Sequence, residues 1–221
     1  MVAEGAGAPA EGARERILDA ALDLFGERGL TGTTVRDIAA RAKVNVAAIS
    51  YHFGGKDELY RAVVESVVSG IATRVRSRVA HLIDRPPADA AAALSALEEF
   101  IGTMMDVIVG PPEMRRVARL IIREQMQPTP AFEILYAMLS QFHGAGTQLF
   151  GVAAGLDPAA EETKLRVFLM IGQVLVLRIA ETAVLRRLGR DSYDAAFMSG
   201  AKALIRQNVR AMVAAAGEGK S

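Results

Sequence analysis

The sequence contains no cysteine, and aromatic residues make up only 5% of its 221 positions. The absence of cysteine excludes disulfides, thiolate metal sites and cysteine nucleophiles. Because aromatic residues are few, the core must be built mainly from Ala, Leu, Val, Ile and Met, and apolar residues reach 51% of the chain. A chain of this length forms one large domain or two small ones and buries a core without cross-links.

The sequence also lacks a charge excess, an export signal and a membrane span. Lys and Arg number 26 against 25 Asp and Glu, so a nucleic-acid partner must be argued from local charge and not from the net charge of +1. Residues 1–12 lack the basic start and the apolar run of a signal peptide. The most apolar stretch, 167–177, is interrupted by Gln173 and is shorter than the roughly 20 residues of a membrane helix. We therefore expect a cytoplasmic protein that has no membrane segment.

Apolar residues recur at helical spacing along almost the whole chain. Ile17, Ala21 and Leu24, for example, share one face before Gly29 interrupts the pattern. No window keeps the alternation of a strand, so we predict an all-α protein of about nine helices. Four helices precede residue 85, and the later five are expected at about 88–109, 113–127, 130–153, 159–188 and 192–215.

The segment from Thr31 to Tyr60 predicts a helix-turn-helix. Thr34 is a good N-cap for a short helix that ends near residue 42, and Asn45 is a good N-cap for a second helix over 46–53. In such a motif the second helix enters the major groove of DNA. Between residues 36 and 56, four Lys or Arg stand against one Asp, so the local charge is 4 − 1 = +3.

The run ERILDAALDLFGERGLTGTTVRDIAARAKVNVAAISYHFGGKDELY resembles the N-terminal DNA-binding domain of TetR-family transcriptional regulators. The resemblance covers about residues 14–62, and VNVAAISYHFGGKDELYRAV is similar to a CecR-like subgroup. We expect a three-helix helix-turn-helix domain at 13–60 and a helical ligand-binding and dimerisation domain at 61–216. Flexible tails are expected at 1–12 and 217–221.

The resemblance makes residues 46–52 the recognition helix. Small side chains at its start would face the groove and contact thymine methyl groups, and Ser50 would offer a hydrogen bond. Phosphate contacts are expected at helix starts and from basic, phenolic or imidazole groups. Asn45 either caps its helix or contacts DNA, and capping is favoured. The predicted DNA-binding residues are Thr33, Thr34, Arg36, Lys43, Asn45, Val46, Ala47, Ala48, Ser50, Tyr51, His52 and Lys56.

Two residues depart from the family pattern. Lys43 stands where the family often has Gly, in a turn that commonly needs a positive φ, at a cost of about 1 kcal/mol. Ser50 stands where many members have Tyr or Asn. The base preference of other members is therefore not transferred to this chain.

A recognition helix reads only a few base pairs, so we expect a dimer that reads two half-sites. The two last helices are the best candidates for a four-helix interface, since the first of them is apolar on nearly all sides. Ordinary core helices are the alternative. The residues predicted at the dimer interface are Phe168, Ile171, Leu175, Ile179, Phe197, Ala201, Leu204, Ile205 and Val209.

The resemblance also implies an inducer pocket in the C-terminal domain. Adaptable apolar side chains and polar groups within helical stretches are the candidates for its lining, although for each Met and Phe a plain core role is the stronger expectation. These candidates are Met104, Met105, Arg119, Arg123, Phe132, Met138, Phe142, His143, Met170 and Gln173.

Enzyme motifs are absent from the sequence. The histidines lack metal-ligand spacing, and neither an HExxH motif nor a serine nucleophile elbow occurs, so we expect no metal, no cofactor and no catalysis. The function predicted is a homodimeric repressor that binds a pseudo-palindromic operator and is released by a small-molecule inducer. The alternatives are an all-α enzyme or carrier with a vestigial helix-turn-helix, and a regulator that activates or needs no ligand.

Overall fold

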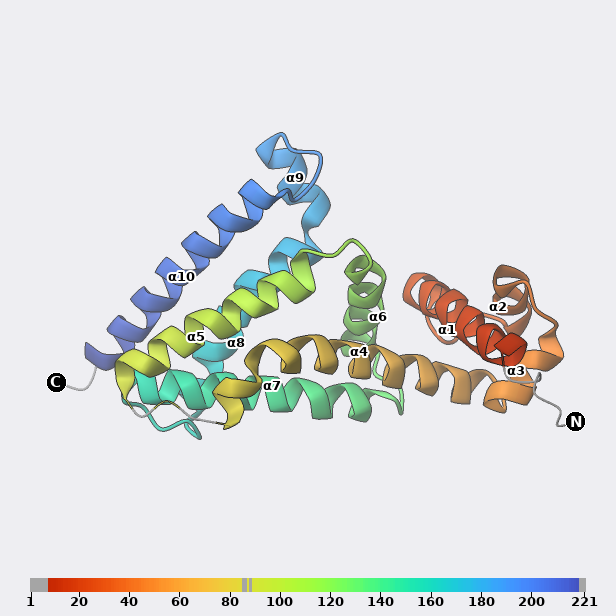
Figure 1. The fold of residues 1–221 in the computed structure, drawn as a ribbon, viewed down its shortest axis with the longest axis horizontal. Helices are drawn as coiled ribbons and strands as arrows, with labels where there is room; N and C mark the ends of the chain where they lie inside the picture. The colour runs from red at the N-terminus through yellow and green to blue at the C-terminus, as the bar shows by residue number, and fades with distance from the viewer. Residues whose placement is uncertain (1–7, 85–86, 88, 219–221) are drawn as a thin grey trace, which may run out of the picture. The chain divides into compact units, whose positions relative to one another are not determined.

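The computed structural model describes residues 8–84, 87 and 89–218. In that part of the chain every regular element is a helix, which confirms the predicted all-α fold (Figure 1). The described residues form ten α-helices and one π-helix, η1, where about nine helices were expected. Their bounds are α1 Ala8–Arg28, α2 Val35–Ala42, α3 Val46–Phe53, α4 Lys56–Asp84, α5 Ala90–Met104, η1 Met105–Val109, α6 Met114–Met126, α7 Phe132–Ala154, α8 Glu161–Ile179, α9 Glu181–Leu188 and α10 Ala195–Glu218.

The chain divides into two compact units. The first combines Met1–Gly70 with Arg116–Tyr136, and the second combines Ile71–Arg115 with Ala137–Ser221. The prediction had assigned all of 61–216 to the second domain, but most of α6 groups with the helix-turn-helix instead. The predicted tails are also shorter in the described residues, because α1 already begins at Ala8 and α10 continues to Glu218. The remaining tail residues lie outside the described part of the chain.

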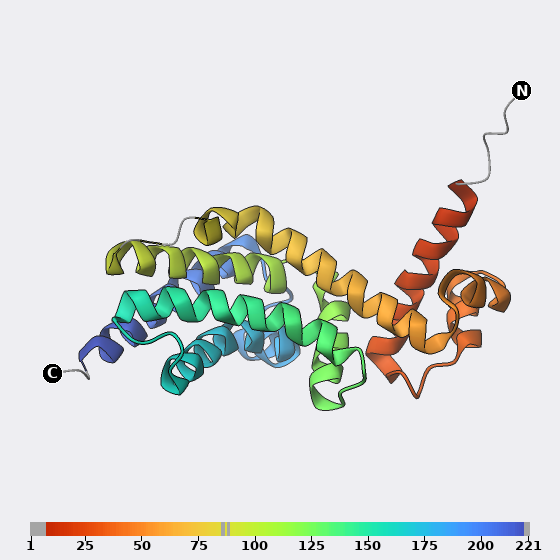
Figure 2. The ribbon, with the colours of Figure 1, turned by 90° about the horizontal axis from the view of Figure 1, so that it is seen from below.

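In the first unit, α1, α2 and α3 pack on one another around a small apolar core (Figure 2). The inward face of α1 buries Ile17, Leu24 and Phe25, as the helical spacing predicted. The short α2 and α3 add Ile38 and Ile49 to this core. Ala39 and Ala42 of α2 are also buried. These buried side chains orient the short helices, because an isoleucine stabilises the fold by about 1.5–3 kcal/mol when it leaves water.

In the second unit, α5, α8, α10 and η1 pack side by side (Figure 1). Their contact surfaces are almost entirely aliphatic, with methionines and a few phenylalanines, as the scarcity of aromatic residues required. The buried core of this unit consists of Ala96, Leu97, Phe100, Ile101, Met104, Met105, Val109, Leu149, Phe150, Ala154, Val167, Met170, Val174, Ile205, Val209, Val213 and Ala216.

The single helix predicted over 159–188 is broken in the structure. Ala180 has φ −100° and ψ 23°, outside the helical range, and α8 and α9 are bent by 76° at this point. No Gly or Pro marks the break in the sequence. Among the described helices no single one is long and apolar enough to cross a membrane, and only the bent α8–α9 pair meets the length and composition criteria together.

A buried arginine lies next to this break. The Arg178 side chain is 3% exposed, and its guanidinium donates to the carbonyl oxygens of Ile108 (2.8 Å), Val109 and Pro111 (3.1 Å). These carbonyls lie where the α5–η1 helical run ends, and that of Pro111 also accepts from the Met114 N–H at 3.1 Å. Glu181 accepts from Arg178 at 2.7 Å and balances the buried charge. Arg178 therefore supplies the donors that close the end of η1.

Candidate nucleic-acid interface

Side-chain caps define both helices of the helix-turn-helix. The backbone N–H of Asp37 donates to the Thr34 hydroxyl at 3.2 Å, and the Thr34 hydroxyl and N–H donate to the Asp37 carboxylate at 2.7 and 3.2 Å. The hydroxyl bond, and after it the backbone bond, lowers the pKa of Asp37. At the second helix the Asn45 side-chain oxygen accepts from the Ala47 N–H at 2.9 Å, which confirms the capping role that was favoured for Asn45.

The turn between the two helices has the strained backbone that the sequence predicted. Lys43 has φ 54° and ψ 49°, the left-handed conformation, and it is the only non-glycine residue with a positive φ in the described part of the chain. Its N–H closes α2 by donating to the Ala40 carbonyl, and the Val44 N–H donates to Ala39 at 3.0 Å. This Schellman-like ending turns the chain sharply into α3.

The α3 helix is anchored on one side and open on the other. Ile49 is 1% exposed, whereas Val46 is 40% and Tyr51 is 83% exposed. Ala47 and Ser50 are also exposed, which is the placement that groove contact requires. The Tyr51 ring meets the His52 ring edge-on, with centroids 5.1 Å apart. Ala48 and His52 are half-buried, so they are less available to the groove than the prediction assumed.

Two predicted phosphate contacts have other roles in the structure. The Thr33 side chain is fully buried, and its hydroxyl lies 2.8 Å from the Gly29 carbonyl oxygen and 3.2 Å from that of Leu24, so the prediction for Thr33 is wrong. The half-buried Lys56 ammonium donates to the carbonyls of Leu30 (3.0 Å) and Thr33 (3.3 Å). Lys56 therefore ties the loop before α2 to the start of α4. Arg36, in the first turn of α2, and Lys43, in the α2–α3 turn, remain exposed cations.

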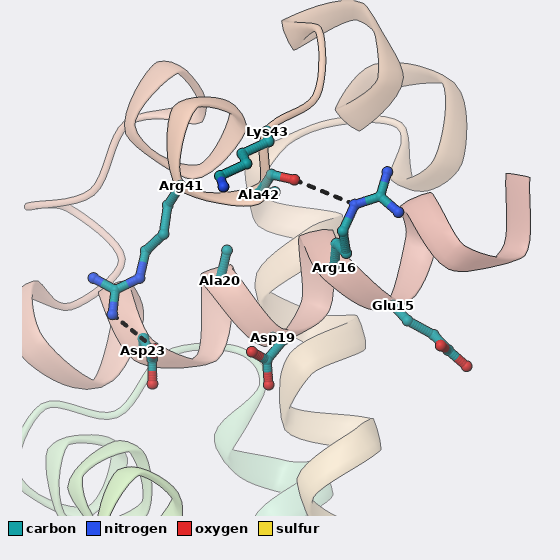
Figure 3. A pocket seen from close by; sticks show the side chains of 8 residues that line it. All are labelled: Glu15, Arg16, Asp19, Ala20, Asp23, Arg41, Ala42 and Lys43. Carbon is teal, nitrogen blue, oxygen red and sulfur yellow. Dashed lines mark hydrogen bonds and ion pairs between the residues drawn. The ribbon is translucent and has the colours of Figure 1, made fainter. Parts of the chain in front are cut away.

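A groove of about 630 Å³ lies between α1 and α2 (Figure 3). It is lined by Glu15, Arg16, Asp19, Ala20, Asp23, Arg41, Ala42 and Lys43. Arg41 donates to Asp23 at 2.8 Å, and Arg16 donates to the Ala42 carbonyl at 3.4 Å, so both arginines link the two helices. Arg41 is therefore neutralised by a carboxylate. Three acidic and three basic side chains line the groove, so it carries no excess of positive charge that would attract phosphate.

The α6 helix is joined to the helix-turn-helix unit by buried and bridging polar groups. Glu124 is 1% exposed, accepts from the Tyr60 hydroxyl at 2.5 Å and accepts from the Thr129 N–H at 3.3 Å. Burial, and after it the bond to Glu124, raises the pKa of Tyr60. Arg123 donates to the Glu27 carbonyl at 2.9 Å.

The predicted dimer residues separate into two groups. Phe168, Ile179 and Leu204 are strongly exposed, and Ile171, Leu175, Phe197 and Ala201 are half-buried. Ile205 and Val209 are buried in the core of their own subunit and are excluded from any dimer surface. Leu165 and Val176 are exposed apolar residues of α8 that the prediction missed, although they continue the i, i+3, i+4 stripe of Phe168 and Leu169.

The residues nominated for an inducer pocket are spread over both units. Arg119, Arg123 and Phe132 belong to the first unit, and the other seven belong to the second. Met104, Met105 and Met170 belong to the buried core, which is the role expected more strongly for each Met, and Met138 is also buried. His143 lies 3.0 Å from the Lys164 carbonyl, and Gln173 accepts from Asn208 at 2.7 Å. Phe142 packs against the core. The inducer pocket stays a prediction.

Replacing Lys43 with glycine should stabilise the protein. Glycine adopts a positive φ without strain, so Lys43→Gly should raise the free energy of unfolding by about 1 kcal/mol. Lys43→Ala is the matched control, because it removes the same ammonium and keeps the strained backbone. Chemical denaturation measures both variants. Equal stability of Lys43→Gly and Lys43→Ala would contradict the assignment of strain.

These features define a class of protein. A compact helix-turn-helix whose second helix is exposed, followed by a helical C-terminal unit, is the architecture of DNA-binding transcriptional regulators. The family models agree with this class. Residues 17–63 match the model of bacterial regulatory proteins of the tetR family, and residues 93–216 match the C-terminal domain of the HTH-type transcriptional dual regulator CecR. The chain belongs to the tetR family, with a C-terminal domain of the CecR type.

Individual relatives support this assignment. The HTH-type transcriptional dual regulator CecR of Shigella flexneri is 30% identical over 188 residues, which cover 83% of each chain. IcaR of Staphylococcus epidermidis, named a negative transcriptional regulator of a biofilm operon, is 40% identical over 53 residues, or 24% of this chain and 29% of IcaR. The structure of the TetR-family regulator PfmR from Thermus thermophilus has a TM-score of 0.60 at 18% identity and covers 90% of this chain and 95% of PfmR. That last likeness concerns the fold alone.

Proposed function

We propose that the protein is a homodimeric cytoplasmic repressor that binds a two-half-site operator through α3 and releases it when a small molecule binds the C-terminal domain. The observation that carries the DNA-binding part is the open face of α3, where Ala47, Ser50 and Tyr51 are exposed while Ile49 anchors the helix. Arg36 in the first turn of α2 and Lys43 in the turn before α3 are exposed and supply phosphate contacts. The relative IcaR carries the name of a negative regulator, which supports repression.

The exposed apolar stripe of α8 supports the dimer. Phe168 is 62% exposed, and Leu165, Leu169, Val176 and Ile179 lie on the same side of the helix. Leu204 of α10 adds a further apolar side chain that is 64% exposed. Soluble proteins rarely leave such a row of large apolar groups in water without a partner. A second copy that covers the same row would make an isologous interface with two-fold symmetry, which matches the symmetry of paired half-sites.

The polar connections of α6 support a route for ligand control. Glu124 and Arg123 hold α6 against α4 and α1 through Tyr60 and the Glu27 carbonyl. A ligand that favours one position of α6 therefore biases the helix-turn-helix unit through these contacts. Control of this kind needs a coupling free energy of about 1–3 kcal/mol.

The salt dependence of DNA binding tests the proposed interface. Binding to DNA from upstream of the protein's own gene should weaken steeply as salt rises, and Arg36→Ala should make the slope of log K against log salt less negative by about one. The control is Thr33→Val, which removes a buried hydroxyl and should leave this slope unchanged. Mobility-shift titrations over a salt series measure both variants. If the wild-type protein binds with no salt dependence and no sequence preference, the proposal is abandoned.

A further inference from the structure

The exposed face of α3 is apolar or weakly polar. The side chains that extend from it are those of Val46, Ala47, Ser50 and Tyr51, and only the last two carry a hydroxyl. Val46 and Ala47 occupy the first turn of α3, directly after the Asn45 cap. In helix-turn-helix proteins the first residues of this helix contact the base edges. The side chains that come closest to the bases are therefore two methyl-bearing groups.

The same helix carries none of the side chains that read bases through paired hydrogen bonds. The α3 sequence VAAISYHF contains no Arg, Lys, Asn, Gln, Asp or Glu, which are the residues that recognise guanine, adenine or cytosine. Asn45 precedes the helix, and its amide oxygen accepts the Ala47 N–H at 2.9 Å, which holds the side chain at the helix end as a cap. Lys56 follows the helix, and its ammonium donates to two backbone carbonyls.

We infer that α3 selects its operator chiefly through the C5-methyl groups of thymine. This inference rests on the proposed DNA-binding function and adds the chemistry of recognition. In the major groove the methyl of thymine is the one apolar feature of the four base pairs, and Val46 and Ala47 offer apolar surface of matching size. Ser50 and Tyr51 contribute single hydrogen bonds, which discriminate less than a bidentate pair. Each contacted methyl should strengthen binding about fourfold, the gain for burying one such group.

Removal of the thymine methyl alone provides the test. A preferred duplex is first selected from random DNA with the full-length protein, and each thymine is then replaced singly by deoxyuridine, which keeps base pairing and all hydrogen-bonding groups. At the thymines beneath α3 each replacement should weaken binding about fourfold. Deoxyuridine placed outside the half-sites should leave affinity unchanged and serves as the DNA control.

The protein side of the test is a double-mutant cycle with Val46→Ala. This substitution removes the two γ-methyl groups of a residue outside the buried core, and it should abolish the deoxyuridine penalty at one thymine of each half-site while the other penalties remain. Melting temperature confirms that the variant is folded.

The outcomes separate this inference from the function on which it rests. The inference is overturned if the protein binds a specific sequence, no deoxyuridine replacement changes its affinity, and 7-deazaguanine or 7-deazaadenine weakens it. The DNA-binding function would then stand. If the protein shows no salt-dependent binding to any duplex, both the DNA-binding function and the inference about thymine methyl groups are wrong.

Discussion

Replacing Ala47 with aspartate should weaken operator binding strongly and leave the fold intact. Ala47 is exposed in the first turn of α3, where the proposal places the DNA bases. A carboxylate at this point faces the phosphates and the electronegative base edges at short range. Like-charge juxtaposition at an interface costs several kcal/mol, so affinity should fall about a hundredfold or more. Fluorescence anisotropy with an operator duplex measures the loss.

The same substitution does not destabilise α3, and this makes the result interpretable. An acidic residue in the first turn of a helix is favourable, because it interacts with the positive end of the helix dipole. The matched control is Ala137→Asp, at an exposed helical alanine of α7, which changes the net charge equally. Ala137→Asp should bind DNA like the parent protein. If the Ala47→Asp variant binds the operator with undiminished affinity, α3 does not contact the DNA.

Replacing Arg178 with methionine should cause a large loss of stability. Its guanidinium donates hydrogen bonds to carbonyl oxygens at the end of η1 and forms an ion pair with Glu181. The side chain is almost completely buried. Methionine fills a similar volume but leaves three carbonyl oxygens without these donors. Buried groups that lose a charged partner cost about 1.5–3 kcal/mol, so the free energy of unfolding should fall by about 3 kcal/mol. Urea denaturation provides the measurement.

Arg166→Met is the control on the same helix. Arg166 pairs with Glu162 at 2.6 Å, one helical turn away, and the Glu162 side chain is largely exposed. Surface pairs of this kind contribute about 0.3–0.5 kcal/mol. Similar losses for Arg166→Met and Arg178→Met would show that the guanidinium at the end of η1 has no special structural role.

The sequence was sufficient for features that depend on local patterns. Helical spacing located most helices to within a few residues, and the caps at Thr34 and Asn45 followed from residue type and position. The left-handed turn at Lys43 could be expected because the residues around it resemble a family that often has glycine there. Each of these features is decided within about one helical turn of chain.

Features that depend on contacts between distant segments could not be read from the sequence. Thr33 stands at a helix start like a phosphate ligand, but its hydroxyl is directed to carbonyls of α1 and the residue after it. Glu124 has the sequence environment of a solvated face, yet Tyr60, 64 residues away, covers it. Arg178 follows an apolar run and is satisfied by carbonyls about 70 residues away. The partners of these polar groups exist only once the helices have packed.

Residues that are equivalent in the helical pattern of the sequence can differ in their burial in the structure. Ile205 and Val209 share the apolar stripe of α10 with Ala201, and the spacing alone gave them equal weight in the dimer surface. In the structure these two residues belong to the subunit core, while Leu204 on the neighbouring position is exposed. The side of α10 that packs against α5 and α8 determines which of its residues are buried and which are exposed.

The number of chains on one operator is the decisive quantity for the proposed function, because paired half-sites need two copies of α3 on the same DNA. Native mass spectrometry of the purified protein with its selected duplex counts the chains, and hydroxyl-radical footprinting of the same complex locates the contacts. The account predicts two chains per duplex and two protected half-sites on one face of the DNA, separated centre to centre by about one helical turn or a multiple of it. A single chain that protects a single half-site at saturating protein would contradict it.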